Sequence, residues 1–323
     1  MDTHLPTPQP MPDSGPVIII PCFNRKAITL GCLRRLTDTG ASAGFRVLVV
    51  DDASTDGTAE AIARDFPEVE VLHGGGELYW TGAMELGMRH AVSQGASCCV
   101  WLNDDLIAVD AAIGSIVELA MRERAMVTAQ GVIQLTNSES WYFKILLKQK
   151  YGLKLLEPTL AISEPVAVDT CRGNLVAIPR SVIEKIGYPD GLNIPHLGGD
   201  SDYGLRATAA GIRCLLLPSA IFYELEAIRT DNQSWLRSNK PVAEIWKAAL
   251  AKRGVLYPRM VIVYNLRHWR LRGAVVVVRD FSRLIVIILL KLVVPMWILN
   301  RFFARSMCIR DIHSRETDES NIS

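Results

Sequence analysis

The sequence predicts an α/β protein with a doubly wound, mostly parallel sheet, followed by a helical extension that is both basic and apolar. Three observations predict this fold. Apolar runs rich in β-branched residues alternate with helix-like segments from Val17 onwards, and each run ends in a polar or glycine-containing loop. Beyond Asp231 the chain becomes helical, basic and strongly apolar. Strands that alternate with helices at this spacing form parallel sheets with right-handed crossovers.

The expected elements follow one another as strand and helix in turn. The expected strands of the N-terminal part are 17–20, 46–50, 69–72 and 98–102, and the helices are 25–37, 58–65 and 81–94. The pattern loosens after Ile133, and we interpret 136–164 as a long insertion or a flap. Order returns over 166–187 as a strand, a turn, a strand and a short helix. The segment GGDSDYGLRATAAG then enters a helix, and IRCLLLP is the next strand.

The chain of 323 residues is long enough for one large α/β domain and an appendage. We expect a disordered, proline-rich segment over 1–16, the α/β domain over 17–230 and a helical region over 231–323. The first segment lacks the charged and then apolar pattern of a signal peptide, so we expect a cytoplasmic protein. The net charge of +1 provides no general attraction for phosphate backbones, so no nucleic-acid partner is expected.

The seven cysteines agree with that compartment. They are scattered along the chain without C-x-x-C spacing, which disfavours a zinc site or a disulfide framework. Most of them lie inside apolar runs, so we expect buried thiols in a reducing environment.

Pairs of carboxylates follow strands of the predicted sheet, whose carboxyl ends meet at one ligand-binding edge. Asp51 and Asp52 either accept hydrogen bonds from a ligand or build a turn that caps the next helix, and the sequence favours neither reading. Asp200 and Asp202 lie where a helix begins. One of them can cap that helix while the other faces the site as a general base.

A third acidic group, WLNDDL, comes directly after a buried strand. The oxygens of Asn103, Asp104 and Asp105 suit a hard divalent ion such as Mg²⁺ or Mn²⁺. The alternative is a solvated loop that caps a helix near Asp110. Like charges side by side are unfavourable without a cation, so we favour the metal site.

Five motifs occur at strand ends in one order: PCFNR, VVDDASTDGT, WTGAMELG, LNDD and GGDSDYGLR. As a set they resemble the family 2 glycosyltransferases, which have the GT-A nucleotide-diphospho-sugar transferase fold. The resemblance covers roughly residues 17–226. The pairing of LYWTGAMELG with WLNDD is most similar to a bacterial subgroup that includes rhamnosyltransferases of surface-polysaccharide assembly.

The resemblance implies roles for individual residues. The positions that match donor-binding motifs are the nucleotide loop (Pro21, Asn24, Arg25), the acidic pair that reads the base (Asp51, Asp52), the loop beneath the ribose and donor sugar (Trp80, Thr81, Gly82) and the D-x-D element (Asn103, Asp104, Asp105). Asp105, the last carboxylate of that element, would bind Mg²⁺ or Mn²⁺. Asp200 is at the general-base position. The acceptor-side or supporting residues would be Arg172, Asp202 and Arg206.

The sequence departs from the family pattern at several places. Asn103 replaces the first acid of the D-x-D element, and Gly199 replaces the glutamate of a G-E-D-x-D element. The stretch from Tyr223 to Glu226 lacks a histidine that often binds metal or phosphate. The Q-x-x-R-W element of polymerising members is also missing, which favours addition of a single sugar.

Together these features predict an inverting, metal-dependent glycosyltransferase. It would move one sugar from a nucleotide-sugar donor, such as dTDP-rhamnose or a UDP-sugar, to a lipid-linked or oligosaccharide acceptor in surface-polysaccharide or glycolipid assembly. The departures leave open a catalytically inactive nucleotide-sugar-binding or scaffold protein. A sugar nucleotidyltransferase is less favoured, because PCFNRK lacks a glycine-rich phosphate loop. The absence of G-x-G-x-x-G after the first strand argues against a NAD-binding domain.

The C-terminal region predicts peripheral contact with the membrane. The run 284–299 is apolar almost throughout, but it is shorter than a spanning helix needs and contains Lys291. The segment RDFSR separates this run from a second apolar run at 274–278. The two runs together would form a hairpin or tilted helices. Flanking arginines suit anionic headgroups, so we expect inner-leaflet contact through 274–305. The alternatives are a segment that spans the membrane, and packing against the catalytic domain or against another copy in a homo-oligomer.

Overall fold

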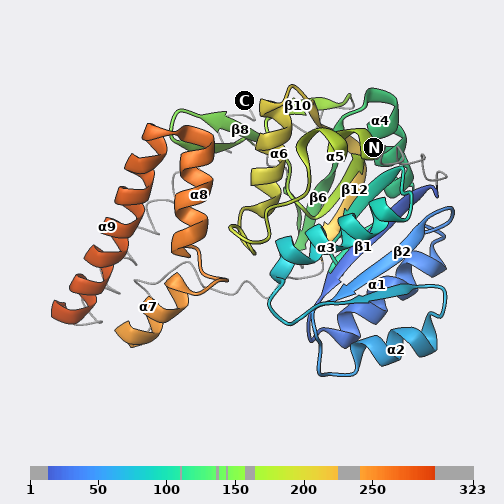
Figure 1. The fold of residues 1–323 in the computed structure, drawn as a ribbon, viewed down its shortest axis with the longest axis horizontal. Coiled ribbons are helices and arrows are strands. Elements are labelled where there is room, and N and C mark those ends of the chain that lie inside the picture. Colours follow the sequence, from blue (N-terminus) through green and yellow to red (C-terminus); the bar gives the residue numbers. More distant parts are fainter. Residues whose placement is uncertain are drawn as a thin grey trace, which may run out of the picture.

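The computed structural model describes residues 14–109, 111–135, 138–142, 145–156, 164–224 and 241–294 (Figure 1). In this part of the chain ten strands form one sheet. Its path in space is β10 (Val166–Val168), β12 (Cys214–Glu224), β6 (Met126–Leu135), β11 (Leu175–Pro179), β4 (Cys98–Leu102), β1 (Pro16–Cys22), β2 (Arg46–Asp51) and β3 (Glu70–His73), with β5 (Leu106–Ala108) on β12 and β7 (Ser138–Tyr142) on β6.

The strand directions confirm the predicted α/β architecture. β3, β2, β1, β4, β6 and β12 run one way, whereas β11, β10, β5 and β7 run the other way. The sheet is therefore mostly parallel. β1 pairs with β2 on one side and with β4 on the other, so the strand order reverses at β1. The loops after β1 and β4 diverge at such a reversal and leave a crevice where ligands bind in open α/β sheets.

Helices cover both faces of the sheet and close two cores. One face packs against α1 (Lys26–Asp38), α2 (Thr58–Asp65) and α4 (Ala112–Glu123), and the other against α3 (Tyr79–Ser93), α5 (Arg180–Ile186) and α6 (Gly199–Ala209). Side chains alternate between the faces along each strand. On β1, Ile18 and Ile20 enter the first core and Ile19 enters the second, and all three are fully buried.

The strands and helices predicted over 17–102 and 166–217 are confirmed to within a few residues. The prediction of buried thiols is also confirmed for the cysteines that the structure describes, which are Cys22, Cys32, Cys98, Cys99, Cys171 and Cys214. Cys308 and the expected domain boundary near Thr230 lie outside the described residues.

The segment 136–164, expected as a long insertion or a flap, contains strands where the structure describes it. β6 continues to Leu135 and pairs with β7, while β8 (Ile145–Gln149) pairs with β9 (Gly152–Leu156) in a separate two-stranded sheet. Two hydrogen bonds with residues outside the β8–β9 hairpin stabilise it. The Lys148 N–H donates to Asp169 Oδ2 (2.6 Å), and Trp269 Nε1 donates to the Gln149 carbonyl (2.8 Å). These partners are distant in the sequence, so local periodicity did not reveal the strands.

The C-terminal helices α7 (Val242–Leu250), α8 (Pro258–Trp269) and α9 (Leu271–Val293) lie beside the sheet body (Figure 1). α9 runs unbroken through 274–278 and the described part of 284–299, so the predicted division at RDFSR is wrong. That segment contains no glycine or proline, and Arg279 pairs with Asp280 (2.8 Å), so nothing in it ends a helix. Within the described residues, no helix is both long enough and apolar enough to cross a membrane.

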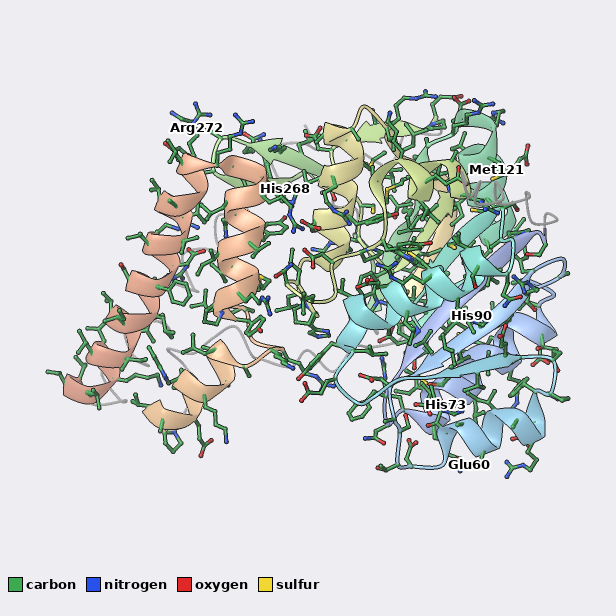
Figure 2. The ribbon with its side chains drawn as sticks, in the orientation of Figure 1. Glu60, His73, His90, Met121, His268 and Arg272 are labelled. Atoms are coloured by element: carbon green, nitrogen blue, oxygen red, sulfur yellow. The ribbon has the colours of Figure 1, made fainter. Side chains whose placement is uncertain are left out.

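A buried ionic cluster centred on Asp202 joins α6 to α8. The Asp202 carboxylate, only 1% exposed, accepts from Arg206 Nε (3.1 Å) on α6 and from Arg267 Nη1 (2.8 Å) on α8. His268 Nε2 lies 2.8 Å from the same carboxylate, and Figure 2 shows His268 at the end of α8 beside α6. Burial alone would raise the pKa of Asp202, but the His268 hydrogen bond and the two arginines outweigh it and hold that pKa below its usual value. The carboxylate therefore stays ionised at neutral pH.

We expect Asp202→Asn to lower the free energy of unfolding by about 3 kcal/mol, because two arginines would lose a buried counter-charge. The depressed pKa means that ionised Asp202 stabilises the wild type above the ordinary carboxyl pKa of about 3.9. That contribution to the free energy of unfolding is lost as the pH falls through the lower pKa of the native state. The variant has no carboxyl at this position, so its stability should not show this loss at acidic pH. Urea unfolding at a series of pH values measures both effects.

Asp65→Asn is the matched control, because it breaks the surface pair between Asp65 and Arg64 (2.7 Å). It should leave the free energy of unfolding nearly unchanged, because exposed ion pairs contribute little to stability. An equal loss of stability in the two variants would show that the Asp202 cluster contributes no more than a surface pair.

Candidate active site

The loops after β1 and β2 are fastened to each other by hydrogen bonds. Asn24 Oδ1 accepts from the Thr55 N–H (2.8 Å). Asp56 accepts from the N–H groups of Lys26 (2.9 Å) and Thr58 (3.2 Å), which begin α1 and α2. One carboxylate thus caps both helices. Asn24 supports this junction, and its predicted contact with a nucleotide stays a prediction.

Asp51 and Asp52 both hold backbone N–H groups. Asp51 Oδ1 accepts from the Ser54 N–H (3.1 Å) in a local turn. The Asp52 carboxylate accepts three N–H groups at 2.6, 2.8 and 3.1 Å, from Gly76, Leu78 and Tyr79. Leu78 is the N-cap of α3 and Tyr79 is its first residue, so Asp52 caps that helix from another segment. Of the two readings of this pair, the structure contains the turn, but the helix that Asp52 caps is α3 and not the next helix, α2. Contact with a base stays a prediction.

The Asn103 amide links Trp80 to a neighbouring loop. Its Oδ1 accepts from Trp80 Nε1 (2.8 Å), and its Nδ2 donates to Asn174 Oδ1 (3.1 Å). A carboxylate could accept from the indole but could not donate to Asn174. Trp80 also packs edge-on against Trp101, with ring centres 5.2 Å apart. The departure from the D-x-D pattern therefore serves to orient Trp80.

Arg25 spans the two carboxylates that follow β4. Its Nη1 lies 2.8 Å from Asp104 Oδ1, and its Nη2 lies 2.9 Å from Asp105 Oδ2. Asp104 is buried and also accepts from Thr29 Oγ1 (2.8 Å). Burial raises the pKa of Asp104 to about 6, against the opposing effects of Arg25 and Thr29. Asp105 is partly exposed, and its Oδ1 has no hydrogen-bond partner in the described ranges.

These loops surround a cavity of about 480 Å³ at the strand-order reversal. Many of the residues predicted to bind a donor line it, namely Pro21, Arg25, Asp52, Trp80, Asn103, Asp104 and Asp105. Its other lining residues were not predicted, and they are Cys22, Phe23, Tyr79, Ala83, His196 and Arg253. The structure thus brings together the strand-end loops that the sequence singled out.

Asp200 lies in the first turn of α6, next to Trp80. Its carboxylate accepts from the N–H groups of Ser201 (2.6 Å) and Gly173 (2.9 Å). Gly173 fills the space between the two side chains: a Cβ built on it would overlap the Trp80 indole and would lie 3.0 Å from Asp200 Cβ. The candidate base is therefore adjacent to a side chain that lines the cavity.

Thr81, in the first turn of α3, packs closely against the segment that leads into α6. Its N–H donates to the Pro195 carbonyl (2.9 Å). A Cβ built on Gly199 would overlap Thr81 Oγ1. The family's glutamate therefore has no room at Gly199, and glycine is required for this contact.

The remaining predicted residues lie away from the cavity. Gly82 is buried in α3. Arg206 donates to the carbonyls of Ile186 (2.9 Å) and Tyr188 (2.6 Å) in addition to Asp202, which agrees with a supporting role. Arg172 is exposed and does not line the cavity.

His196 and Arg253 are cavity residues that the sequence reasoning missed. His196 follows Pro195 in a loop that was interpreted only as a connection. Burial lowers the pKa of His196, the nearby Arg253 charge lowers it further, and Asp200 partly offsets both effects. Arg253 belongs to the helical C-terminal region 231–323 and precedes the segment 274–305 that was expected to contact the membrane. The GGDSD motif, which begins two residues after His196, was the available signal for the histidine, whereas nothing local marked Arg253.

The donor set around Asp105 suits a divalent ion that is shared with a ligand. The described residues contain no group of three or more His, Cys, Asp or Glu side chains that could hold a metal by themselves. Mg²⁺ is usually bound by one or two carboxylates together with substrate phosphates. Around the same cavity, Asp104 Oδ1 and His196 Nδ1 are buried atoms without an aligned hydrogen-bond partner in the described part of the chain. These residues fit a metal bound together with a diphosphate.

Residues 17–186, more than half of the chain, match the family model described as glycosyl transferase family 2. The chain belongs to this family. It is a glycosyltransferase with the GT-A fold, as its motifs predicted. No curated protein matches the chain.

Two solved structures share the fold of this glycosyltransferase. One is GalNAc-T7 with UDP, GalNAc and Mn²⁺, with a TM-score of 0.55 and 12% identity over 67% of this chain and 44% of that chain. The glycosyltransferase thus spans less than half of GalNAc-T7. The other is the mannosyltransferase PcManGT from Pyrobaculum calidifontis in complex with GDP-Man and Mn²⁺, with a TM-score of 0.52 and 16% identity over 94% of this chain and 82% of that chain. At these identities the likeness concerns the fold.

We expect Gly199→Glu, which restores the family's glutamate, to destabilise this glycosyltransferase by more than about 2 kcal/mol, because the new side chain would collide with Thr81. Thermal and urea unfolding measure the loss. Gly114→Glu is the control, since a Cβ at that exposed helical glycine meets nothing within 4 Å. Equal stability of the two variants would mean that the contact between Gly199 and Thr81 imposes no constraint.

Proposed function

We propose that this family 2 glycosyltransferase transfers a single sugar from a nucleotide-sugar donor to a hydroxyl acceptor, with inversion at the anomeric carbon. The observation that carries the proposal is the cavity at the strand-order reversal, which Arg25, Trp80 and Asp105 line and whose Trp80 side chain is next to Asp200. The diphosphate would lie near the charged residues, and the acceptor hydroxyl would approach from the side of Asp200.

In this proposal Asp200 is the general base. It takes the proton of the acceptor hydroxyl while the hydroxyl oxygen attacks the anomeric carbon and the bond to the nucleoside diphosphate breaks. The N–H groups of Ser201 and Gly173 hold the carboxylate in place. A single displacement of this kind inverts the anomeric centre.

Asp105 would hold Mg²⁺ or Mn²⁺ together with the donor's diphosphate. A divalent ion bound there offsets the negative charge that develops on the leaving diphosphate. Arg25 orients Asp105 and neutralises Asp104 in the ground state. The two relatives in fold were solved with Mn²⁺ and with UDP or GDP-Man, which supports a metal and a nucleotide-sugar donor. The motif resemblance favours dTDP-rhamnose or a UDP-sugar and a lipid-linked or oligosaccharide acceptor.

The test is nucleotide release from a panel of UDP-, GDP- and dTDP-sugars, with and without Mn²⁺ or Mg²⁺. We expect metal-dependent release from one donor. Asp105→Ala should lose this release together with Mn²⁺ binding in the presence of the nucleoside diphosphate, measured by electron paramagnetic resonance. Asp200→Asn should lower the rate by about 100-fold or more while donor affinity is unchanged. Full release by Asp200→Asn would refute its role as the base, and unchanged Mn²⁺ binding by Asp105→Ala would refute the metal assignment.

The exposed face of α9 supports the proposed contact with the inner leaflet. A series of its apolar side chains is at least 50% exposed: Leu271, Val275, Val278, Ile285, Val286, Leu289, Leu292 and Val293. At about 100° per residue these positions fall within roughly 120° of the helix circumference. Arg272, Arg279 and Arg283 are exposed along one edge of that strip, and Figure 2 shows Arg272 at the end of α9 nearest α8. An apolar strip beside a row of arginines suits a surface of anionic lipids.

We expect the enzyme to bind vesicles that contain anionic phosphatidylglycerol more tightly than neutral phosphatidylcholine vesicles. The double variant Val275→Asp with Leu289→Asp should weaken this binding by at least about tenfold, because it places charges in the apolar strip. Vesicle co-sedimentation measures the affinity. Leu192→Asp, a change at an equally exposed leucine (70%) outside α9, is the control and should have no effect. Unchanged binding by the double variant would exclude this strip as the contact.

A further inference from the structure

Arg253 carries a cation from the C-terminal region into the donor cavity. It lies in the turn between α7 and α8 and lines the same cavity as Arg25 and Asp105. Its guanidinium carbon is 5.5 Å from the ring centre of Phe23 and 5.3 Å from that of Tyr79. These aromatic residues come from the loop after β1 and from the start of α3. Cation–π contact with both rings holds the guanidinium at the cavity wall.

The turn that carries Arg253 is anchored on both sides. Lys252 forms an ion pair with Glu77, which precedes α3. The Leu256 N–H donates to the Ala249 carbonyl (3.0 Å), and Leu256 is buried in an apolar cluster with Ile194. Because these contacts order the turn in advance, little entropy would be lost when Arg253 binds a ligand.

The charge of Arg253 is not neutralised by a carboxylate in the described part of the chain. Arg25, the other arginine of the cavity, is already paired with Asp104 and Asp105. The lowered pKa of His196, caused first by burial and then by Arg253, agrees with a positive charge at this wall. A cation that has no carboxylate partner among the described residues and that lines a cavity of this size provides a favourable position for an anionic group.

We propose that Arg253 binds the diphosphate of the nucleotide-sugar donor, so that the C-terminal region completes the donor site. The planar guanidinium donates two parallel hydrogen bonds to phosphate oxygens while its face stays on the aromatic rings. This assignment rests on the proposed function, because the ligand is the donor proposed there. It also means that the donor site crosses the expected domain boundary near Thr230.

The experiment measures the affinity of the full-length protein for UDP, GDP and dTDP, and for the corresponding nucleosides, by isothermal titration calorimetry. Arg253→Ala should weaken binding of the preferred nucleoside diphosphate by about tenfold, as expected for the loss of one charge-assisted contact. Binding of the nucleoside should change by less than about twofold, because the base and ribose keep their contacts. Arg253→Lys should give an intermediate affinity, since it keeps the charge but loses the planar fork.

Arg122→Ala, which removes an exposed arginine on α4, is the control and should bind like the wild type. Wild-type affinity for the diphosphate in Arg253→Ala would overturn the assignment while leaving the proposed function intact. An equal loss for the diphosphate and for the nucleoside would also overturn it, because Arg253 would then act by holding Phe23 and Tyr79. If the wild type binds no nucleoside diphosphate of the panel, the proposed function fails and the assignment fails with it.

Discussion

The arrangement of the active site depends on the buried charge of Asp202. Asp200, two residues before it, occupies the candidate base position. The Asp202 carboxylate contacts Arg267 and His268, which come from α8. Removing charges from water is costly, so the cluster is stable only when its partners are in place together. Arg267 also reaches Asp190 (2.5 Å) in the segment before α6. The C-terminal helices are therefore joined to the sheet body by charge as well as by apolar packing.

Some of the carboxylates that follow strands hold the loops of the site in place, and others are available to bind a metal or to accept a proton. Asp51, Asp52 and Asp56 accept backbone N–H groups: Asp51 holds a turn after β2, Asp52 caps α3, and Asp56 caps α1 and α2. Asp105 keeps an oxygen without a partner in the described residues, and Asp200 lies beside Trp80. Acidic residues at a sheet edge repel one another, and these hydrogen bonds and Arg25 offset that repulsion before any ligand or metal arrives. The loops are thus organised in advance for a charged donor.

Two departures from the family pattern have a common physical cause, which is the position of Trp80. Asn103 replaces an acid because its amide accepts from the Trp80 indole and donates to Asn174 at the same time. Gly199 replaces a glutamate because Thr81, the residue after Trp80, occupies the space. Neither substitution removes Asp105 or Asp200. The departures that suggested an inactive protein therefore have a structural explanation that leaves the candidate chemistry intact.

The sequence by itself determined the α/β fold, the order of the first strands and helices, and the strand-end loops that surround the cavity, because these follow from local periodicity and from the meeting of parallel strands at one edge. Tertiary structure decided what local patterns do not encode. The β8–β9 hairpin depends on partners such as Trp269. Whether Asp52 faces a ligand or a helix end depends on where α3 begins. Arg253 lies at the cavity only because α7 and α8 fold back beside the sheet body, through contacts between residues far apart in the sequence.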